Sequence, residues 1–370
     1  MNDVSGANGA PRLAALATAL PREVVRQTDA RALAIVLFKD QLSADDQRLF
    51  AVFENTGIEQ RHFCMPLEWY AADHDFGERN RLYVDHALRL AETAIRTTLE
   101  RAGLAPRDLD HLVFVSSTGL ATPSLDARLA NVLGLRADVR RTPIWGLGCA
   151  GGAAGLARAH DFALADPGAR VMLVALELCS LTFQRRELSR RNLVAASLFS
   201  DGAAAALVLG ARAHGGGGNG AARPLGLVAA RSTLWPDTLD VMGWEVDSNG
   251  LHVVFSPDIP SVVHDRVRAP LDAFLAGHDL GLGTLAHLIA HPGGPKVLAA
   301  YGEALGLPAT AFRHAAAVLR ERGNMSSPTC LFVLERALAA GDVGAGESAL
   351  LAALGPGFAS EMVLMRGLEA

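Results

Sequence analysis

Short apolar runs alternate along the chain with longer segments of helical periodicity. The clearest helix is predicted over residues 79–102, where apolar side chains recur three or four positions apart and Gly103 follows as a stop signal. Buried strands are predicted where the apolar runs are short and bounded by turn residues, at 13–20, 111–116, 171–176, 203–209, 285–290 and 347–354. Strands that alternate with helices in this way predict an α/β fold.

The second half of the chain repeats the order of elements in the first half. The strand at 285–290 and the loop after it parallel residues 111–119, and Asn324 precedes a helix as Cys149 does. This repetition predicts a duplicated α/β unit. The predicted divisions are a loose tail (1–11), a first half (12–213), a glycine-rich connection (214–223) and a second half (224–370).

Composition excludes several classes of protein. Half of the 370 residues are hydrophobic and the net charge is −5, so the bulk charge does not indicate a nucleic-acid partner. No apolar stretch is long enough for a membrane span and the first residues lack a signal-peptide pattern, so we expect a cytoplasmic protein. The four cysteines show no paired spacing, which predicts reduced thiols without a disulfide framework or a metal site.

Cys149 stands in the glycine-rich stretch Gly146-Leu-Gly-Cys-Ala-Gly-Gly152, between a short predicted strand at 142–145 and a helix predicted over 150–164. The start of a helix offers unpaired N–H groups and the positive end of the helix dipole, which both favour a thiolate. Cys149 is therefore a candidate nucleophile. Taken alone, however, a single cysteine among glycine and alanine is more typical of inert packing.

Two further residues become candidates through the predicted duplication. If the halves pack about a pseudo-twofold axis, loops at equivalent strand ends face one another. Cys149 and Asn324 then lie at matching helix starts, and His291 lies at a matching strand end. The fold could thus bring together a cysteine, a histidine and an asparagine that are far apart in sequence.

Five motifs in order give the chain a resemblance to a known family. They are GLGCAGG (146–152), LFSDGAAA (198–205), HPGGPKVL (291–298), GNMSSPT (323–329) and GPGF (355–358). Over residues 12–368 the chain resembles the type III polyketide synthases, the chalcone and stilbene synthase family with its bacterial members. The β-ketoacyl carrier-protein synthases share a Cys, His, Asn set, but their histidine usually stands in a His-Gln-Ala-Asn context that His291 lacks.

The resemblance implies a five-layered thiolase fold, a homodimer, and coenzyme A thioesters as substrates, with no separate cofactor and no metal. It matches Cys149 to the nucleophile, His291 and Asn324 to its two partners, and Phe199 to an aromatic residue at the site entrance. The residues that it places around the acyl cavity or near the dimer contact are Ser117, Thr122, Cys179, Thr182, Ser326, Gly355, Pro356 and Gly357. The coenzyme-A-binding residues stay unassigned.

The implied chemistry follows from the residue types. Cys149 takes an acyl starter from its coenzyme A thioester, with a charged His291 holding the thiolate as an ion pair. Malonyl-CoA then loses CO₂, and N–H donors of His291 and Asn324 stabilise the resulting enolate. The enolate attacks the acyl group on Cys149, and the cycle repeats.

Small residues near the predicted cavity favour a fatty acyl starter that gives an alkylpyrone or alkylresorcinol. An acetyl or malonyl starter that gives a small pyrone or polyhydroxylated aromatic remains open. Two other readings compete with a synthase. The same three residues could form an acyl-CoA thioester hydrolase, or the chain could be a non-catalytic acyl-CoA-binding protein on the thiolase scaffold.

Several other residues have plainer interpretations. Arg48 and Arg61 could meet an anionic cofactor, although solvated surface arginines are the more typical reading. The charged segment 184–191 is expected on a solvated helix face, and Asp201 in a structural turn. The remaining cysteines are expected to be small core residues, and these are Cys64, Cys179 and Cys330.

Overall fold

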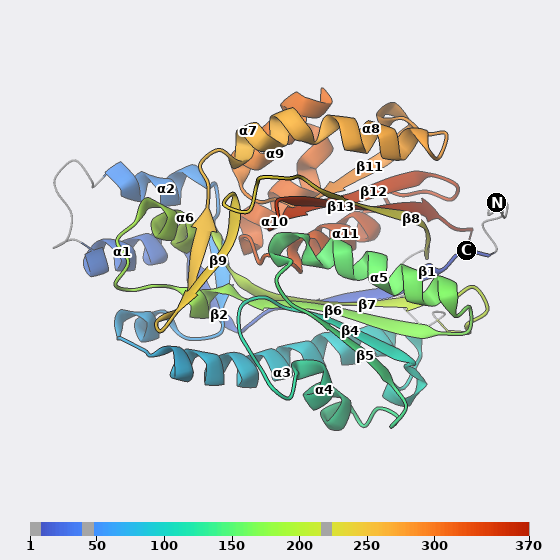
Figure 1. Cartoon of the computed structure of the whole chain (residues 1–370), viewed down its shortest axis with the longest axis horizontal. Coiled ribbons are helices and arrows are strands. Elements are labelled where there is room, and N and C mark those ends of the chain that lie inside the picture. Colours follow the sequence, from blue (N-terminus) through green and yellow to red (C-terminus); the bar gives the residue numbers. More distant parts are fainter. Residues whose placement is uncertain (1–8, 39–47, 216–223, 370) are drawn as a thin grey trace.

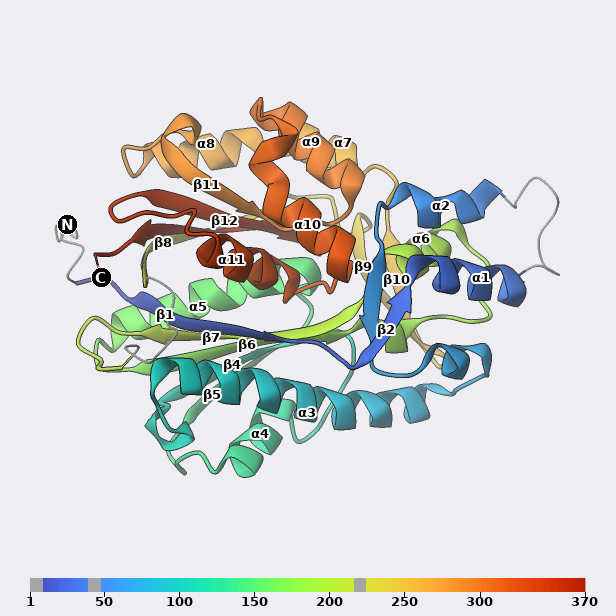
Figure 2. The ribbon, with the colours of Figure 1, turned by 180° about the vertical axis from the view of Figure 1, so that it is seen from behind.

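The computed structural model describes residues 9–38, 48–215 and 224–369. Two layers of strands alternate with three layers of helices (Figures 1 and 2). The outer helices of the first half are α3 (Phe76–Ala102) and α4 (Leu125–Leu133), the central helices are α5 (Gly151–Ala165) and α11 (Thr329–Ala339), and the outer helices of the second half are α7 (Ile259–Arg266), α8 (Arg268–Ala276) and α9 (Pro295–Leu305). Helix α10 (Arg313–Arg322) leads from this outer layer towards α11. The five layers agree with the predicted α/β fold.

The strands of the first half are β1 (Arg12–Ala19), β4 (His111–Val115), β5 (Arg140–Ile144), β6 (Arg170–Leu178) and β7 (Asp201–Leu209). They lie in the order β1-β7-β6-β4-β5. Strand β4 is parallel to β5 and β6, whereas β7 is antiparallel to both β6 and β1. The carboxyl ends of β4, β5 and β6 therefore meet at one edge, which is where the loops after parallel strands build sites.

The second half repeats this topology with β8 (Leu225–Leu234), β11 (Leu285–Ala290), β12 (Ser348–Gly355) and β13 (Ala359–Gly367). Strand β11 is parallel to β12, which is antiparallel to β13, and β13 is antiparallel to β8. This order matches β4-β6-β7-β1, so the predicted duplication is confirmed at the level of topology. Two residue pairs between β1 and β8 join the two groups of strands. The predicted connection and tail lie mostly outside the described residues, at 216–223 and 1–8.

Helix α5 is rich in glycine and alanine because it is enclosed by strands of both halves. A Cβ atom on Gly152 would lie 2.2 Å from the carbonyl oxygen of Ser327, and one on Gly155 would lie 2.5 Å from Leu173 Cδ1. Such close approach is possible only without side chains at these positions. The small residues after Cys149 thus hold the start of α5 against the segment that begins with Asn324.

The amphipathic helix predicted over 79–102 is confirmed, and it begins three residues earlier. The Asp75 carboxylate caps it by accepting a 2.7 Å hydrogen bond from the Glu78 backbone N–H. Gly103 ends it in the left-handed conformation, with φ 66°. Among the helices that the structure describes, none is both long and apolar enough to cross a lipid bilayer.

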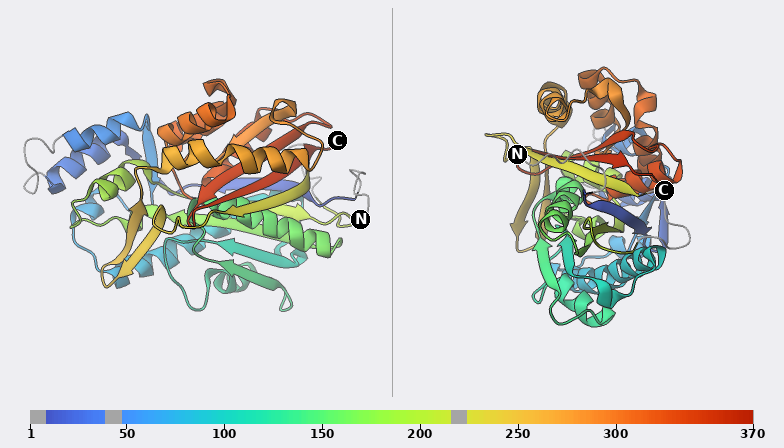
Figure 3. Two further views of the ribbon diagram at one scale, coloured as in Figure 1. Left: turned by 45° about the horizontal axis from the view of Figure 1, so that its top comes forward. Right: turned by 90° about the vertical axis from the view of Figure 1, so that its right-hand side faces the viewer.

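One end of the molecule carries a cap of smaller elements (Figure 3). They are β2 (Glu23–Arg26), α1 (Gln27–Phe38), α2 (Ala51–Asn55), β3 (Gln60–Phe63), α6 (Arg190–Leu198) and the hairpin of β9 (Met242–Asp247) and β10 (Gly250–Phe255). Two sequence expectations were wrong here. Residues 184–189 precede α6 rather than forming a helix, and Asp201 is the buried first residue of β7 rather than part of a turn.

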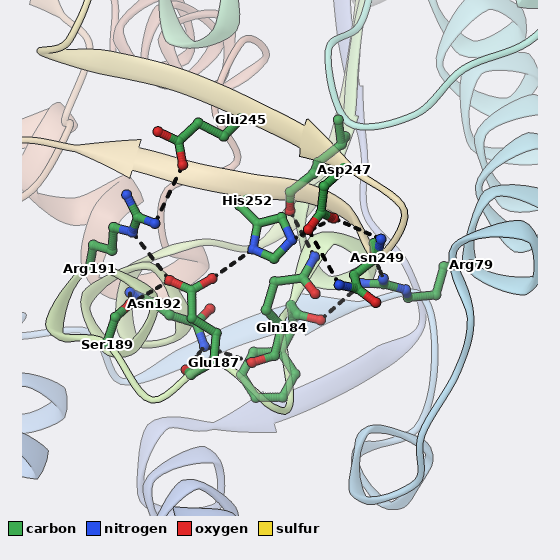
Figure 4. Close-up of polar contacts among 12 residues, drawn as sticks. Arg79, Gln184, Glu187, Ser189, Arg191, Asn192, Glu245, Asp247, Asn249 and His252 are labelled. Carbon is green, nitrogen blue, oxygen red and sulfur yellow. Dashed lines mark hydrogen bonds and ion pairs between the residues drawn. The ribbon is translucent and has the colours of Figure 1, made fainter.

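A polar network fixes the β9–β10 hairpin to the loop before α6 (Figure 4). The two ring nitrogens of His252 lie 2.8 Å from Glu187 Oε2 and 2.9 Å from Asp247 Oδ1. Partial burial opposes protonation, but the two carboxylates raise the pKa of His252. The Gln184 side chain also donates to the Leu251 carbonyl (2.9 Å), so the charged segment at 184–191 anchors the hairpin.

Candidate active site

Cys149 lies in the single turn Gly148–Ala150 that leads into α5, as predicted. Gly146 and Gly148 adopt φ values of 94° and 45°, which a residue with a side chain rarely does. A Cβ atom on Gly148 would also lie 2.8 Å from Pro356 Cδ. The thiol is buried, with 5% of the residue exposed. The glycines therefore hold a buried cysteine in a tight turn, beside the Gly355–Gly357 loop.

Asn324 lies at the matching position in the second half, and its backbone is bonded on both sides to the end of α6. Its N–H donates to the Leu198 carbonyl and its carbonyl accepts from the Ser200 N–H, both at 2.9 Å. Its side-chain Oδ1 accepts a 2.8 Å hydrogen bond from the Ser326 N–H, and Nδ2 lies 3.3 Å from the Gly293 carbonyl. The amide orientation is thereby fixed, with its donor group towards the loop that follows His291.

His291 follows β11 directly, and its N–H donates to the Ala352 carbonyl at 2.9 Å. Its ring is buried, and neither ring nitrogen has a hydrogen-bond partner among the described residues. A buried polar ring without partners is costly unless a ligand completes it. The contact of Asn324 Nδ2 with Gly293 holds the His291 and Asn324 loops together, and hydrogen bonding from Ser326 and Asn324 acts on the Cys149 thiol.

Burial controls the protonation of both titratable groups. It raises the pKa of Cys149 to about 11, in spite of hydrogen bonding by Ser326 and Asn324, and it lowers the pKa of His291 to about 3. In the free protein the pair is therefore a neutral thiol and a neutral imidazole. Burial thus acts against the thiolate that the helix start was expected to favour. The predicted ion pair stays a prediction for the substrate-bound state.

Glu177, near the end of β6, is a site residue that the sequence reasoning missed. It is completely buried, and its carboxylate accepts hydrogen bonds from Ser117 N–H (2.8 Å), Thr118 Oγ1 (2.8 Å), Ser327 Oγ (2.9 Å) and Ser116 Oγ (3.3 Å). Burial raises the pKa of Glu177 to about 7, although the hydrogen bonds from these donors lower it. The charge of Glu177 in turn raises the pKa of Cys149. A glutamate inside the apolar run 171–178 was the signal that could have revealed it.

Five of the other predicted site residues lie in three different surroundings. Cys179, Thr182 and Phe199 line a narrow apolar cavity whose far end is formed by α1. Ser117 instead supports the cysteine turn, because its Oγ accepts from the N–H groups of Gly146 (3.2 Å) and Gly148 (3.3 Å). Thr122 is exposed, away from this cavity.

The Gly355-Pro356-Gly357 loop packs against the cysteine turn. A Cβ atom on Gly355 would lie 2.5 Å from the Leu147 carbonyl oxygen and 2.6 Å from Ala150 Cβ. Ser326 has a left-handed backbone, with φ 57°, and contacts the Cys149 thiol rather than the apolar cavity. Both segments therefore shape the immediate surroundings of the nucleophile.

A second hollow, with a volume of about 630 Å³, opens beside the His291 loop. Gly293, Gly294 and Lys296 form one side of it, and the segment around Arg48 and the start of α6 form the other. Four basic residues line this basic groove, namely Arg48, Arg190, Arg191 and Lys296. Arg61, the other arginine considered in the sequence, is not a surface residue but is almost completely buried.

One cluster of possible metal ligands occurs among the described residues, in the outer part of the second half. It consists of His287, His314 and Asp342, whose ligand atoms lie within 4.8 Å of one another. The Arg313 guanidinium is bonded to the same Asp342 carboxylate oxygen that His314 contacts. The Arg313 guanidinium already neutralises the Asp342 carboxylate, so the three residues form an ion-paired and hydrogen-bonded network.

The comparisons with known proteins agree with this geometry. Residues 2–212 match the family described as chalcone and stilbene synthases, N-terminal domain, and residues 226–369 match its C-terminal domain. The chain belongs to the chalcone and stilbene synthase family. The resemblance inferred from the five motifs is thereby confirmed.

Three bacterial proteins illustrate the similarity of this chalcone and stilbene synthase family member to its relatives. A 1,3,6,8-tetrahydroxynaphthalene synthase of Streptomyces peucetius subsp. caesius is 44% identical over 96% of this chain and 92% of its own length. A putative chalcone synthase of Bacillus subtilis (strain 168) is 40% identical over 94% of this chain and 96% of its own length. The solved 1,3,6,8-tetrahydroxynaphthalene synthase of Streptomyces coelicolor A3(2), a bacterial type III polyketide synthase, superposes with a TM-score of 0.90, 33% identity, and coverage of 97% of this chain and 100% of that one.

The protein is therefore a type III polyketide synthase, an acyl-CoA condensing transferase with the predicted thiolase fold. The relatives are named for several different products. Their names therefore do not assign a starter or a product to this enzyme.

Proposed function

We propose that this type III polyketide synthase loads an acyl starter on Cys149 and uses His291 and Asn324 to decarboxylate and condense malonyl-CoA. The observation that supports the proposal is a buried histidine ring without hydrogen-bond partners among the described residues, in a loop held by Asn324, whose side chain also lowers the pKa of the buried Cys149 thiol against the effect of burial. His291 offers two unpartnered ring nitrogens, and Asn324 has an amide fixed by Ser326. Preorganised donors in a desolvated site stabilise developing negative charge most effectively.

Loading begins from the neutral pair. The neutral imidazole of His291 accepts the Cys149 proton as sulfur attacks the thioester carbonyl, and it returns that proton to the departing coenzyme A thiolate. A pKa of about 3 makes His291 a weak base at rest, so the proton moves only when the bound thioester is in place. The same low pKa keeps the imidazole neutral for the second step, where an N–H donor is needed.

Condensation follows with malonyl-CoA. The bond to the malonyl carboxylate breaks, CO₂ leaves, and the electron pair moves into the thioester carbonyl to form an enolate. Donors of His291 and Asn324 stabilise the enolate oxygen, and Asn324 serves because it donates without titrating. The enolate carbon then attacks the acyl carbonyl on Cys149, which releases the sulfur and leaves a chain two carbons longer on coenzyme A.

The basic groove provides the coenzyme A site that the sequence left unassigned. Arg48, Arg190 and Lys296 line the groove, and Lys296 lies in the first turn of α9. Phosphates of coenzyme A are favoured by such side chains and by the positive end of a helix. The groove also includes Gly293 and Gly294, so a pantetheine arm that enters there reaches the His291 loop directly.

Lys296→Ala and Arg190→Ala are each expected to raise the KM for the acyl-CoA starter about three- to tenfold, with little change in kcat. The reason is that each removes one partly solvated contact with phosphate, which contributes far less than a buried one. Steady-state kinetics at 50 and 300 mM salt test this, because the difference from the wild type shrinks as salt increases. Arg107→Ala, an exposed arginine on another face, is the control. A fall in kcat at unchanged KM would contradict the assignment.

We propose a fatty acyl starter and an alkylpyrone or alkylresorcinol product from the lining of the apolar cavity, whose free space of about 70 Å³ must widen to admit a long chain. Its narrow space is lined by Ala30, Leu33, Ala34 and Leu37 of α1, by Phe53 and Phe63, and by Phe199. A saturated chain removes both its own surface and these side chains from water, at roughly 25 cal/mol per Å². Cys179 lines this cavity, and we propose that the acyl chain passes from the nucleophile into the cavity at this end.

A second candidate is a small polyhydroxylated aromatic product from an acetyl or malonyl starter. The observation in its favour is the names of the relatives, since three are 1,3,6,8-tetrahydroxynaphthalene synthases and another is a phloroglucinol synthase.

We also propose a homodimer that uses the exposed surface around Thr122, where Leu120 and Trp145 are about half exposed. Coenzyme A thioesters are the only small molecules that the proposed reaction requires.

A product assay tests the proposal. Purified protein is incubated with labelled malonyl-CoA and acyl-CoA starters from C2 to C16, beside Cys149→Ala. We expect labelled polyketide from the wild type, with the highest kcat/KM for long starters, and none from Cys149→Ala. Product from short starters only would support the polyhydroxylated aromatic. Free acid without a need for malonyl-CoA would instead show a hydrolase, and acyl-CoA binding without product would show a non-catalytic protein.

A further inference from the structure

Arg61 is a buried cation in the wall of the apolar cavity, with donors to spare. It lies in β3 and is 1% exposed. Its Nη1 donates to the carbonyl oxygens of Ala196 (2.6 Å) and Phe199 (2.9 Å). Its Nε and Nη2 have no hydrogen-bond partner within the described part of the chain. Buried guanidinium donors without acceptors are costly, so their presence calls for a ligand that supplies oxygen.

The other buried polar side chains of this cavity have already used their donors. Tyr70 donates its hydroxyl to Ser180 Oγ (2.6 Å), and Ser180 donates to Asp201 (2.6 Å). Asn192 donates both amide hydrogens to the carbonyls of Gln184 and Glu187, at 2.8 Å each. Thr182, which is partly buried, donates to the Cys179 carbonyl (2.8 Å). Arg61, which lines the cavity and packs over the Phe63 ring, therefore keeps buried donors that no other described group uses.

The guanidinium keeps its charge in this environment. Burial lowers the pKa of Arg61 to about 9, and the nearby Asp201 opposes that decrease. Asp201 does not bond Arg61, because its oxygens accept from the Ser180 N–H and hydroxyl and from the Cys64 N–H. At neutral pH the cavity wall thus carries a positive group whose free donors are not satisfied by the neighbouring carboxylate.

Arg61 also lies next to the catalytic asparagine. A Cβ atom on Gly323 would be 2.8 Å from Arg61 Cγ, and Gly323 precedes Asn324. Phe199, whose carbonyl binds Arg61, pairs with Asn324 through a β-bridge. The stem of Arg61 therefore packs against the residue that precedes Asn324, and Arg61 shares the lining of the cavity with four residues of α1.

We propose that Arg61 binds the carbonyl and enolate oxygens of the growing β-keto chain. This rests on the proposed function, in which each condensation adds a keto group while the alkyl end occupies the apolar part of the cavity. A saturated starter has no oxygen for Arg61, but the chain gains acceptors from the first extension onwards. A charged donor pair holds a β-diketone or its enolate at two oxygens and so retains the chain for further extension. Arg61 is thus a specificity residue for chain length.

Binding to a protein that cannot react gives the direct test. In a Cys149→Ala background, 3-oxododecanoyl-CoA and dodecanoyl-CoA are compared by calorimetry. We expect the 3-oxo compound to bind about tenfold more tightly, since a hydrogen bond to a charged group contributes on that order. With Arg61→Met added, the two Kd values should become equal. Equal affinities while Arg61 is present would overturn the proposal, and this comparison does not require the Arg61 variant to fold.

Product length gives the second test. Single Arg61→Met protein, with dodecanoyl-CoA and malonyl-CoA, should shift the ratio of tetraketide to triketide products about tenfold towards triketide. A purely structural role, through Phe199 and Gly323, would lower all products and starter loading together and leave that ratio unchanged. Arg61→Lys, which retains a charge, should give an intermediate ratio, and Arg26→Met on the exposed strand β2 is the matched control. Absence of any polyketide from the wild type would refute the proposed function instead.

Discussion

Asn324→Ala is expected to lower the rate of malonyl-CoA decarboxylation about 100- to 1000-fold. Removing one preorganised donor from an oxyanion site has an effect of this order. The amide of Asn324 is fixed by the Ser326 N–H and lies against the Gly293 carbonyl, so no neighbouring group can replace it without rearrangement of both loops. The measurement is release of acetyl-CoA from labelled malonyl-CoA, without any starter.

The rate at which Cys149 is acylated distinguishes a role of Asn324 in enolate stabilisation from a purely structural role. Intact-protein mass spectrometry after a short exposure to dodecanoyl-CoA measures acylation of the same variant. We expect loading to fall much less than decarboxylation, because the thiol and His291 are still present. The variant also loses the acceptor for the Ser326 N–H, so thermal unfolding is recorded in parallel. Equal losses in both reactions would indicate a collapsed site, and an unchanged decarboxylation rate would exclude Asn324 from enolate stabilisation.

Asn324→Asp provides a sharper comparison. Aspartate retains an oxygen acceptor for the Ser326 N–H but replaces the Nδ2 donor with a second oxygen. A negative charge there would repel both the malonyl carboxylate and the enolate. We expect the decarboxylation rate of Asn324→Asp to equal that of Asn324→Ala or to fall below it, although the hydrogen bond from the Ser326 N–H is preserved.

Much of the fold could be predicted because its elements have strong local signals. Helix α3 shows an uninterrupted apolar period and a glycine stop, and the buried strands are short apolar runs. The cap was predicted less well. Residues 23–26 lie within a segment of helical spacing, but they pair with β3 as a strand, because tertiary pairing overrides a short local pattern.

The site was predicted where a motif marks it and missed where only burial does. Cys149, His291 and Asn324 stand in glycine-rich motifs that a sequence displays openly. Arg61 is a single charged residue in a short strand, and its spacing does not show that it is buried, whereas the apolar run around Glu177 was a signal that was not used. The sequence also favoured a thiolate at Cys149, because a helix start is visible in sequence whereas the desolvation that raises its pKa depends on the packed halves.

Glu177 leads to the largest expected effect on stability. Glu177→Ala should lower the free energy of unfolding by about 3–5 kcal/mol, because each of several buried donors left without an acceptor costs about 1–3 kcal/mol. The hydroxyl groups of Thr118 and Ser327 and the Ser117 N–H would lose their acceptor in a completely buried space. Chemical denaturation measures the loss. Glu335→Ala, which removes a partly exposed ion pair with Arg101, is the control and should cost far less.

The pH dependence distinguishes a titrating Glu177 from a merely well-packed one. Its pKa is about 7 in the folded state and near 4.5 when unfolded, so the folded state binds the proton more tightly. Stability from this group is complete below the unfolded pKa and is lost as the pH rises through the folded value. Glu177→Gln cannot titrate. The stability advantage of the wild type over Glu177→Gln should therefore shrink by about 2.5 kcal/mol between pH 5 and pH 8. A constant difference would mean that Glu177 is ionised throughout, and that its four donors outweigh its burial.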